Sequence, residues 1–260
     1  MRNKLIAPFA ILLLITPLVA CGLLRRSSYK WHLVLEVDPA VANREAATTE
    51  TVEILNSRLN HLGLGGFRVA AVGAAKDGRL RVDLPDVADP LRLKNFIVAR
   101  GSLQLAHVVS NPSPAPCQTY KTKDDAKSAL AAAQDRKTLP YPDHGEVKWV
   151  VIDSTPIIEG RDLRTAAAVP DYGGKDYQIT FTLKPDAATK FGAWTAANIN
   201  QYIGVVLNDE VKSIVFIRSQ IVDTGQINGQ FTKEMAEDLA QILMSGPLPA
   251  AIKIVEEGRN

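Results

Sequence analysis

The chain has 260 residues, of which 46% are hydrophobic and 22% are charged. This composition predicts a folded globular protein with a substantial core and excludes an intrinsically disordered one. The 30 basic and 28 acidic residues nearly balance, and the basic residues form no stripe along the sequence. Because nucleic-acid-binding proteins normally carry a basic surplus, we expect no nucleic-acid partner.

The first twenty residues have the pattern of an export signal. Arg2 and Lys4 precede a mostly apolar run over residues 5–19, which is short and is interrupted by two prolines. Such a run suits the hydrophobic region of a signal peptide better than a membrane-spanning helix. We therefore expect residues 1–20 to be a signal peptide that is removed, which leaves 28 of the 30 basic residues against 28 acidic ones.

The run over residues 18–22, LVACG, resembles a bacterial lipobox, in which the cysteine is lipidated and becomes the new amino terminus. It predicts a lipid anchor at Cys21 and a tether over residues 21–28 that would hold the folded part close to a membrane. A plain secretory signal cleaved after Ala20 and an uncleaved anchor are the alternatives. If Cys21 is acylated, Cys117 has no partner, so we expect no intramolecular disulfide.

Hydrophobic periodicity predicts a βαββαβ order over residues 29–110, which is the order of a ferredoxin-like module. The fold class is therefore α+β, with two helices on one face of an antiparallel sheet. The predicted strands are residues 32–38, 67–72, 79–84 and 103–109, and the predicted helices are residues 44–62 and 90–100. The strand over residues 103–109 is expected to close the sheet beside the first strand.

Residues 111–172 are predicted to be an insert or connector. The segment opens with the proline-rich run NPSPAP over residues 111–116, which breaks the preceding pattern. A helix is predicted over residues 123–134 and a strand over residues 147–153, whereas residues 139–145 are expected to be irregular.

A second α+β module is predicted over residues 173–257. Its elements are strands at residues 177–183, 203–207 and 211–217, a helix at 185–198, a strand beginning at Gly225, a helix after Thr232 and a strand at 251–255. Thr232 is the expected N-cap of the last helix, and Gly246 is expected to end it in a left-handed conformation. Met235, Leu239 and Ile242 form its predicted apolar face, with Ala236, Ala240 and Leu243 beside them.

Motifs for catalysis and for cofactor binding are absent from the sequence. It contains no nucleophile elbow, phosphate-binding loop or dinucleotide fingerprint, and the glycines of residues 63–66 follow a helix when a phosphate site would need them before one. The acidic pairs Glu159 with Asp162 and Asp209 with Glu210 are predicted to lie in solvated turns. We therefore expect no enzyme, no catalytic residue and no cofactor.

His32 and His107 would come close if the first and last strands of the ferredoxin-like module were neighbours. Two histidines do not make a zinc site without further ligands, so we expect no metal site. Trp31, Trp149 and Trp194 are expected to be core or edge aromatics. The alternative is that the apolar faces of the elements leave a groove for an extended peptide.

Eight short motifs follow one another in the order typical of one family. They are residues 53–58 (EILNSR), 79–85 (RLRVDLP), 156–163 (PIIEGRDL), 181–183 (FTL), 203–207 (IGVVL), 215–218 (VFIR), 225–232 (GQINGQFT) and 246–250 (GPLPA). This ordered set resembles the first periplasmic domain of SecD, a bacterial Sec translocon accessory protein. The resemblance implies a base around residues 29–110 plus the carboxy-terminal segment, and a head between them that handles polypeptide emerging from the translocon.

The sequence also departs from that family. Residues 29–32 (YKWH) stand where the family has a glycine-rich segment, and residue 260 stands where the family continues into membrane helices linked to proton flow. We therefore expect a stand-alone lipoprotein without the proton-coupled part.

Three hypotheses for function follow. The first is a lipid-anchored, SecD-like module that binds unfolded or translocating polypeptide, or Sec translocon components. The second is an envelope-assembly or structural lipoprotein of the same fold without a translocon. Gly22 favours the second, because a cysteine not followed by aspartate usually directs a lipoprotein to the outer membrane, although the inner membrane stays possible. The third, a hydrolase with a site scattered over loops, is the least favoured because the motifs are missing.

Overall fold

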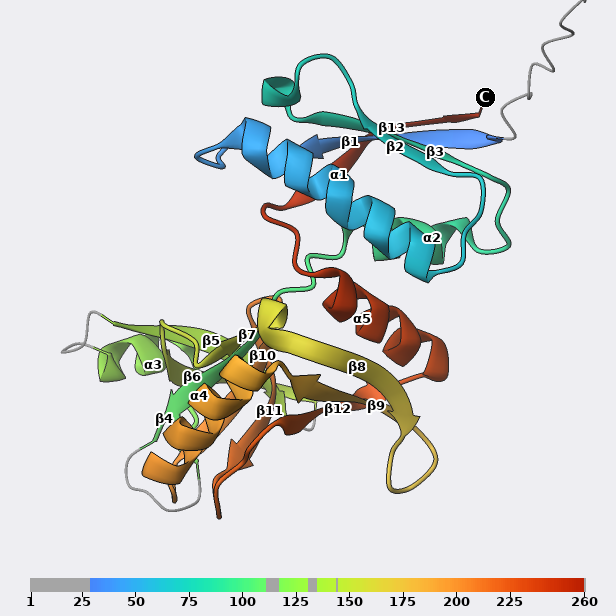
Figure 1. Cartoon of the computed structure of the whole chain (residues 1–260). Coiled ribbons are helices and arrows are strands. Elements are labelled where there is room, and N and C mark those ends of the chain that lie inside the picture. The colour runs from blue at the N-terminus through green and yellow to red at the C-terminus, as the bar shows by residue number, and fades with distance from the viewer. Residues whose placement is uncertain (1–28, 111–116, 131–134, 144, 260) are drawn as a thin grey trace, which may run out of the picture.

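The computed structural model describes residues 29–110, 117–130, 135–143 and 145–259. The predicted signal peptide, the lipidation residue Cys21 and the tether to residue 28 lie outside the described residues. The described chain forms two units, the upper and lower parts of Figure 1, and the helix α5 (Lys233–Ser245) lies between them. We call the upper unit the base and the lower unit, together with α5, the head.

The base is a four-stranded antiparallel sheet with two helices packed on it. Its strand order is β13 (Ile252–Arg259), β1 (Trp31–Val37), β3 (Arg79–Leu84) and β2 (Arg68–Ala71), and its helices are α1 (Arg44–His61) and α2 (Pro90–Val98). Leu55 and Leu59 of α1 and Ile97 of α2 are fully buried in one cluster with Leu35 and Leu80 of the sheet. The apolar spacing that predicted these elements therefore also builds the core of the base.

The prediction that residues 103–109 close the base sheet is wrong. This strand, β4 (Leu103–Val109), pairs with β10 (Tyr202–Leu207) of the head, and the place beside β1 is taken by β13 from the end of the chain. The βαββαβ arrangement exists in space, but its last strand comes from the carboxy terminus. Alternating burial along a strand determines which face packs inward and does not determine the neighbouring strand.

The described residues of the head form two antiparallel sheets. The larger has the order β11 (Glu210–Phe216), β10, β4, β6 (Glu146–Asp153) and β5 (Arg136–Asp143), with β7 (Ile158–Glu159) also paired to β4. The smaller has the order β12 (Thr224–Phe231), β9 (Tyr177–Leu183) and β8 (Leu163–Pro170). The head helices are α3 (Lys123–Ala129), α4 (Pro185–Ala197) and α5.

The insert contains more strand than the sequence predicts. Residues expected to be irregular belong to β5, where Pro140 and Pro142 pair with Trp149 and Val147 of β6. Proline is tolerated there because β5 is the last strand of its sheet. The outer edge of such a strand needs no backbone N–H groups for pairing. The predicted helix over 123–134 is confirmed as α3 to Ala129, where it ends with Leu130 as its C-cap, and residues 131–134 lie outside the described part.

The start of α5 is confirmed, and its buried face is shifted from the predicted one. The Thr232 hydroxyl accepts a hydrogen bond from the Met235 backbone N–H at 3.3 Å, as an N-cap does. Ala236, Ala240 and Leu243 pack into the head core and Ile242 of the predicted face is also buried, whereas Met235 is 54% exposed. Gly246 ends the helix at φ 87°, ψ 162°, a positive φ but not the predicted left-handed helical conformation.

The chain passes between base and head twice, at Ala99 and Arg100 (the first crossing) and at Ser245 and Gly246 (the second crossing). A buried arginine of α1 bonds to both crossings. Arg58 has no exposed surface. Its guanidinium donates to the carbonyl oxygens of Ala99 (2.5 Å) and Arg100 (3.3 Å) in the first crossing, and to Gly246 O (3.2 Å) and Ser245 Oγ (3.1 Å) in the second. Burial lowers the pKa of Arg58 to about 10, so the side chain stays charged at neutral pH.

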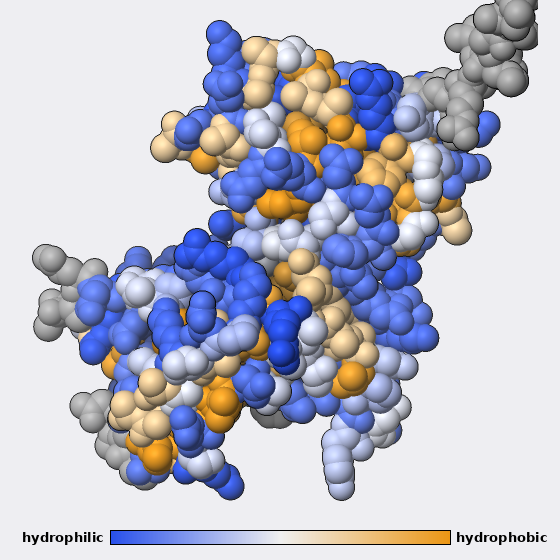
Figure 2. Space-filling view, viewed as in Figure 1, coloured by the Kyte–Doolittle hydropathy of each residue, from blue (hydrophilic) through white to orange (hydrophobic). Residues whose placement is uncertain are grey.

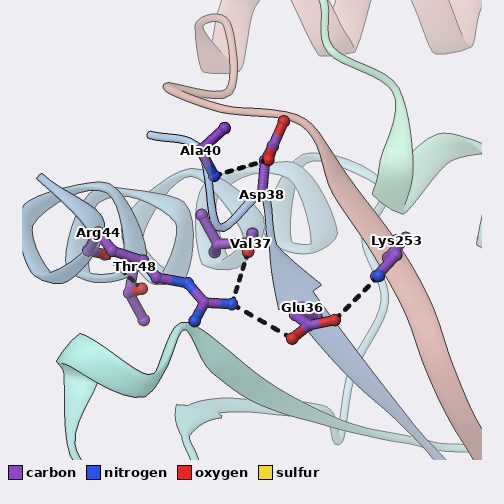
Figure 3. A network of polar contacts seen from close by, with 7 residues as sticks. All are labelled: Glu36, Val37, Asp38, Ala40, Arg44, Thr48 and Lys253. Atoms are coloured by element: carbon purple, nitrogen blue, oxygen red, sulfur yellow. Dashed lines mark hydrogen bonds and ion pairs between the residues drawn. The ribbon is translucent and has the colours of Figure 1, made fainter. Parts of the chain in front are cut away.

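A second polar network ties the sheet of the base to α1 (Figure 3). Glu36 of β1 lies between Lys253 of β13, whose Nζ is 3.1 Å from Oε2, and Arg44 of α1, whose Nη2 is 3.3 Å from Oε1. Arg44 also donates to the carbonyl of Val37 at 2.9 Å. Lys253 and, to a smaller extent, Arg44 lower the pKa of the Glu36 carboxyl, so this link between β13, β1 and α1 stays ionised at neutral pH.

Candidate functional site: an uncharged cavity between the two head sheets

A cavity of about 620 Å³ lies between the larger and the smaller sheet of the head. Its walls come from β4, β10 and β11 on one side, from β8, β9 and β12 on the other, and from α4 and the loop before β12. The lining residues are Leu105, Thr165, Ala167, Thr180, Phe181, Thr182, Phe191, Ile203, Val205, Val215, Ile221, Thr224, Gly225, Gln226 and Asn228. The elements that form it are far apart in the sequence.

Among the described residues, the lining carries no ionisable side chain. Leu105, Ile203 and Val205 form an apolar wall and are almost completely buried. The opposite wall carries threonine hydroxyls and side-chain amides, and two of these hydroxyls, Thr165 Oγ1 and Thr182 Oγ1, lie 2.6 Å apart in a mutual hydrogen bond. An apolar wall with a few neutral polar groups is the usual composition of a site that binds an organic ligand.

The loop that precedes β12 is held in place by a buried threonine of α4. Thr195 Oγ1 accepts a hydrogen bond from Ile221 N at 3.0 Å and contacts the Phe191 carbonyl oxygen at 3.0 Å. Gln220 Nε2 also donates to the carbonyl of Gly192 at 3.2 Å. These bonds hold Ile221 and Phe191 at the cavity, so one wall of the site depends on the contact between this loop and α4.

The two glycines of the run over residues 225–232 leave room for aromatic rings. A Cβ at Gly225 would lie 2.3 Å from Cζ of Phe181, the residue opposite it on β9. A Cβ at Gly229 would lie 2.5 Å from the ring of Phe231. Aromatic rings laid over strand glycines fix the register of a strand pair, and at Gly225 the arrangement also shapes the cavity, because both residues line it.

One edge of the smaller sheet is open beside the cavity. β12 ends the sheet and pairs only with β9 among the described strands. The pairing is regular from Thr224 to Ile227 and is interrupted before Phe231. Thr224, Gln226 and Asn228 of this strand line the cavity, so free backbone groups of β12 lie next to its wall.

The histidines do not form the pair that the sequence allowed. His32 lies in the base sheet with Glu256 at 3.7 Å, whereas His107 lies in the larger head sheet. His107 Nδ1 is 2.8 Å from Asp153 Oδ2, and its ring packs edge-on against Trp194 at 5.6 Å between ring centroids. Within the described residues, no three His, Cys, Asp or Glu side chains are grouped so that they could hold a metal ion.

The acidic pairs named from the sequence make structural contacts in turns. Asp162 Oδ2 accepts a hydrogen bond from Glu159 N at 2.9 Å, and Asp209 pairs with Arg100 at 3.2 Å. Asp209 and the neighbouring Asn208 have positive φ angles, as a two-residue hairpin turn requires. Cys117 is partly buried, and burial raises the pKa of its thiol, which disfavours the reactive thiolate.

On the face shown in Figure 2, hydrophobic residues lie in small patches among hydrophilic ones. This pattern is ordinary for a water-exposed surface. No helix in the described part of the chain is both long and apolar enough to span a membrane.

Comparison with known proteins identifies the family. The family model described as "SecDF, P1 head subdomain" matches residues 136–250. The protein translocase subunit SecD of Aquifex aeolicus (strain VF5) is 36% identical over 214 residues, which are 82% of this chain and 40% of that protein. The chain belongs to the SecD family. SecD of Koribacter versatilis (strain Ellin345) is 30% identical over 217 residues, 82% of this chain and 39% of that protein.

Solved structures agree with this assignment. The structure titled "Structure and function of a membrane component SecDF that enhances protein export" matches with a TM-score of 0.64 at 26% identity, over 86% of this chain and 98% of that chain. "Crystal structure of SecDF in Super-membrane-facing form" matches with a TM-score of 0.67 at 26% identity, over 88% of this chain and 30% of that chain. The α+β fold class is confirmed, and the chain spans about 40% of the length of the SecD proteins it resembles.

The boundaries at residues 110 and 172 stay predictions. The sequence named no residue of the cavity as a site, although it left open a groove for an extended peptide. The run over residues 225–232 contains Gly225, a strand glycine that could have indicated the cavity wall. A glycine in a strand does not reveal which aromatic ring covers it, so its contact with Phe181 could not be predicted.

Proposed function

We propose that this SecD-family chain binds segments of exported polypeptide in the head cavity and assists Sec-dependent translocation as a membrane-tethered binding module, not as an enzyme. The observation that carries the proposal is the uncharged cavity beside the open edge of β12. The relatives supply the context, since they are named protein translocase subunits and one matched structure is titled as a component that enhances protein export.

The chemistry of the cavity suits an unfolded segment of varied sequence. Exported chains differ in their side chains but share a backbone and frequent apolar residues. Backbone groups on the free edge of β12 can pair with an extended segment, and the apolar wall at Leu105 and Val205 can accept its side chains. Because no lining group in the described part of the chain is charged, affinity should depend on apolar burial and backbone pairing and little on salt concentration.

Binding of an unfolded peptide tests the proposal. A fluorescent, uncharged peptide with alternating apolar residues is expected to bind the purified protein saturably, with an affinity that changes less than about twofold between low and physiological salt. A photo-crosslinker placed at Thr182 should label the peptide, whereas one placed at the exposed Val147 of β6 should not. The proposal fails if the peptide does not bind or if both positions label it equally.

We also propose that a lipid on Cys21 provides the tether. The support is the lipobox pattern of residues 18–22. We expect the wild-type protein to sediment with membranes and the Cys21→Ala variant to be released, because acyl chains supply stable anchoring. Variant protein that stays fully membrane-bound would contradict the proposal. Density separation of the two membranes then tests the alternative function, since recovery in the outer membrane would favour an envelope-assembly lipoprotein.

A further inference from the structure

The helix α5 has a second apolar face, of which Leu239 is partly buried against the head core. Ala236, Ala240 and Leu243 are buried in the head. Met235, Leu239 and Ile242, the stripe that the sequence singled out, line a separate cavity of about 520 Å³ against α2 of the base. This groove lies between one helix of the base and one of the head. Its lining shares no residue with the cavity between the two head sheets.

The groove has a buried floor and exposed apolar sides. Phe96 of α2 is 3% exposed and forms part of the floor, whereas Leu91 of α2 is 66% exposed and Met235 of α5 is 54% exposed. Arg92 of α2 bonds both carboxylate oxygens of Asp238 of α5, each at 2.8 Å. This bidentate pair links the two helices across the groove.

Carboxylates outnumber cations around the groove. Asp89 and Asp238 line it, and Glu234 and Glu237 lie close enough to help Asp238 raise the pKa of Arg92. The cations of α2 and α5 are Arg92, Lys94 and Lys233, and each is already paired with a carboxylate: Arg92 with Asp238, Lys94 with Glu257 at 3.0 Å, and Lys233 with Glu237 at 3.8 Å. The rim therefore presents an excess of negative charge beside Leu91 and Met235.

We propose that the α2–α5 groove is a docking site for a basic amphipathic helix of a partner protein. Its apolar side would cover Leu91 and Met235, and its lysines or arginines would face the carboxylates of the rim. Grooves between helices accept amphipathic helices in this way, and charge complementarity selects the basic kind. This inference is independent of the proposed peptide binding, because the other cavity lies within the head and is lined by different residues.

Two synthetic peptides test the charge preference. One is an amphipathic Leu/Lys helix of about 18 residues, and the other is the matched Leu/Glu helix, each labelled and titrated against the full chain by fluorescence anisotropy. We expect the Leu/Lys peptide to bind, to lose affinity as salt rises, and to bind at least about tenfold more tightly than the Leu/Glu peptide. Equal affinity for the two peptides would overturn the proposal.

Substitutions place the peptide on the groove. Leu91→Ser combined with Met235→Ser should weaken binding of the Leu/Lys peptide by about tenfold, and Glu234→Gln should weaken it less. Val147→Ser, at an equally exposed position on β6, should leave binding unchanged. Unchanged binding in the folded double variant, or sedimentation showing that the groove pairs two copies of the chain, would overturn the proposal. Gly225→Ala should leave binding of the Leu/Lys peptide unchanged. This result would distinguish binding at the groove from binding in the head cavity.

Discussion

Replacing Arg58 with methionine is expected to lower the free energy of unfolding by about 3 kcal/mol or more, because several buried acceptors lose their donor at once. Arg58 is completely buried and serves the carbonyls of Ala99, Arg100 and Gly246. Methionine fills a similar volume, so the loss reflects hydrogen bonding more than packing. Urea denaturation measures the change through the transition midpoint.

Arg58→Lys is the informative second variant. Lysine keeps the charge, but its single ammonium cannot span acceptors in both crossings as the guanidinium fork does. We expect an intermediate loss of stability, together with faster amide hydrogen exchange at Leu248, whose N–H donates to Arg100 O at 2.8 Å between the two crossings.

The matched control is Arg161→Met. Arg161 is an arginine with a side chain 77% exposed, paired with Glu159, and exposed ion pairs contribute about 0–1 kcal/mol. If Arg58→Met and Arg161→Met changed the midpoint equally, the central role given to Arg58 at the junction would be wrong.

Replacing Gly225 with alanine is expected to weaken binding of the unfolded peptide by about tenfold or more and to cost about 1–3 kcal/mol of stability, as overpacking does. The added methyl group would lie 2.3 Å from the ring of Phe181, a residue that is 2% exposed. Relief of this contact requires the ring to move into the cavity or β12 to separate from β9. Either movement alters the wall that the peptide is proposed to use.

Two variants control for the added methyl group. Gly65→Ala adds one where no atom lies within 4 Å and the backbone has no positive φ, so neither binding nor stability should change. Gly225→Ala combined with Phe181→Leu removes the clash and should recover part of the stability, since neighbouring substitutions are coupled. Wild-type peptide affinity in folded Gly225→Ala would show that the peptide does not use this wall.

The sequence by itself determined the local structure and the family. Apolar spacing and capping residues placed α1 and α5 within about one or two residues, as the N-cap Thr232 illustrates. The prolines of β5 misled the same reasoning, because an edge strand tolerates residues that a central strand does not. Ordered motifs over most of the chain were sufficient to indicate SecD membership.

Only the tertiary structure decided which strands are neighbours, and therefore where the cavity lies. β4 and β13 are both short alternating strands that suit the place beside β1, and their sequences do not state which one occupies it. The same limit applies to Arg58. A charged residue in a helix is expected at the surface, and only the folded chain shows that two distant segments bury this one. Side-chain periodicity shows which face of an element is buried and does not show which other element covers it. Contacts between distant segments, and the cavity that they form, are therefore seen only in the folded chain.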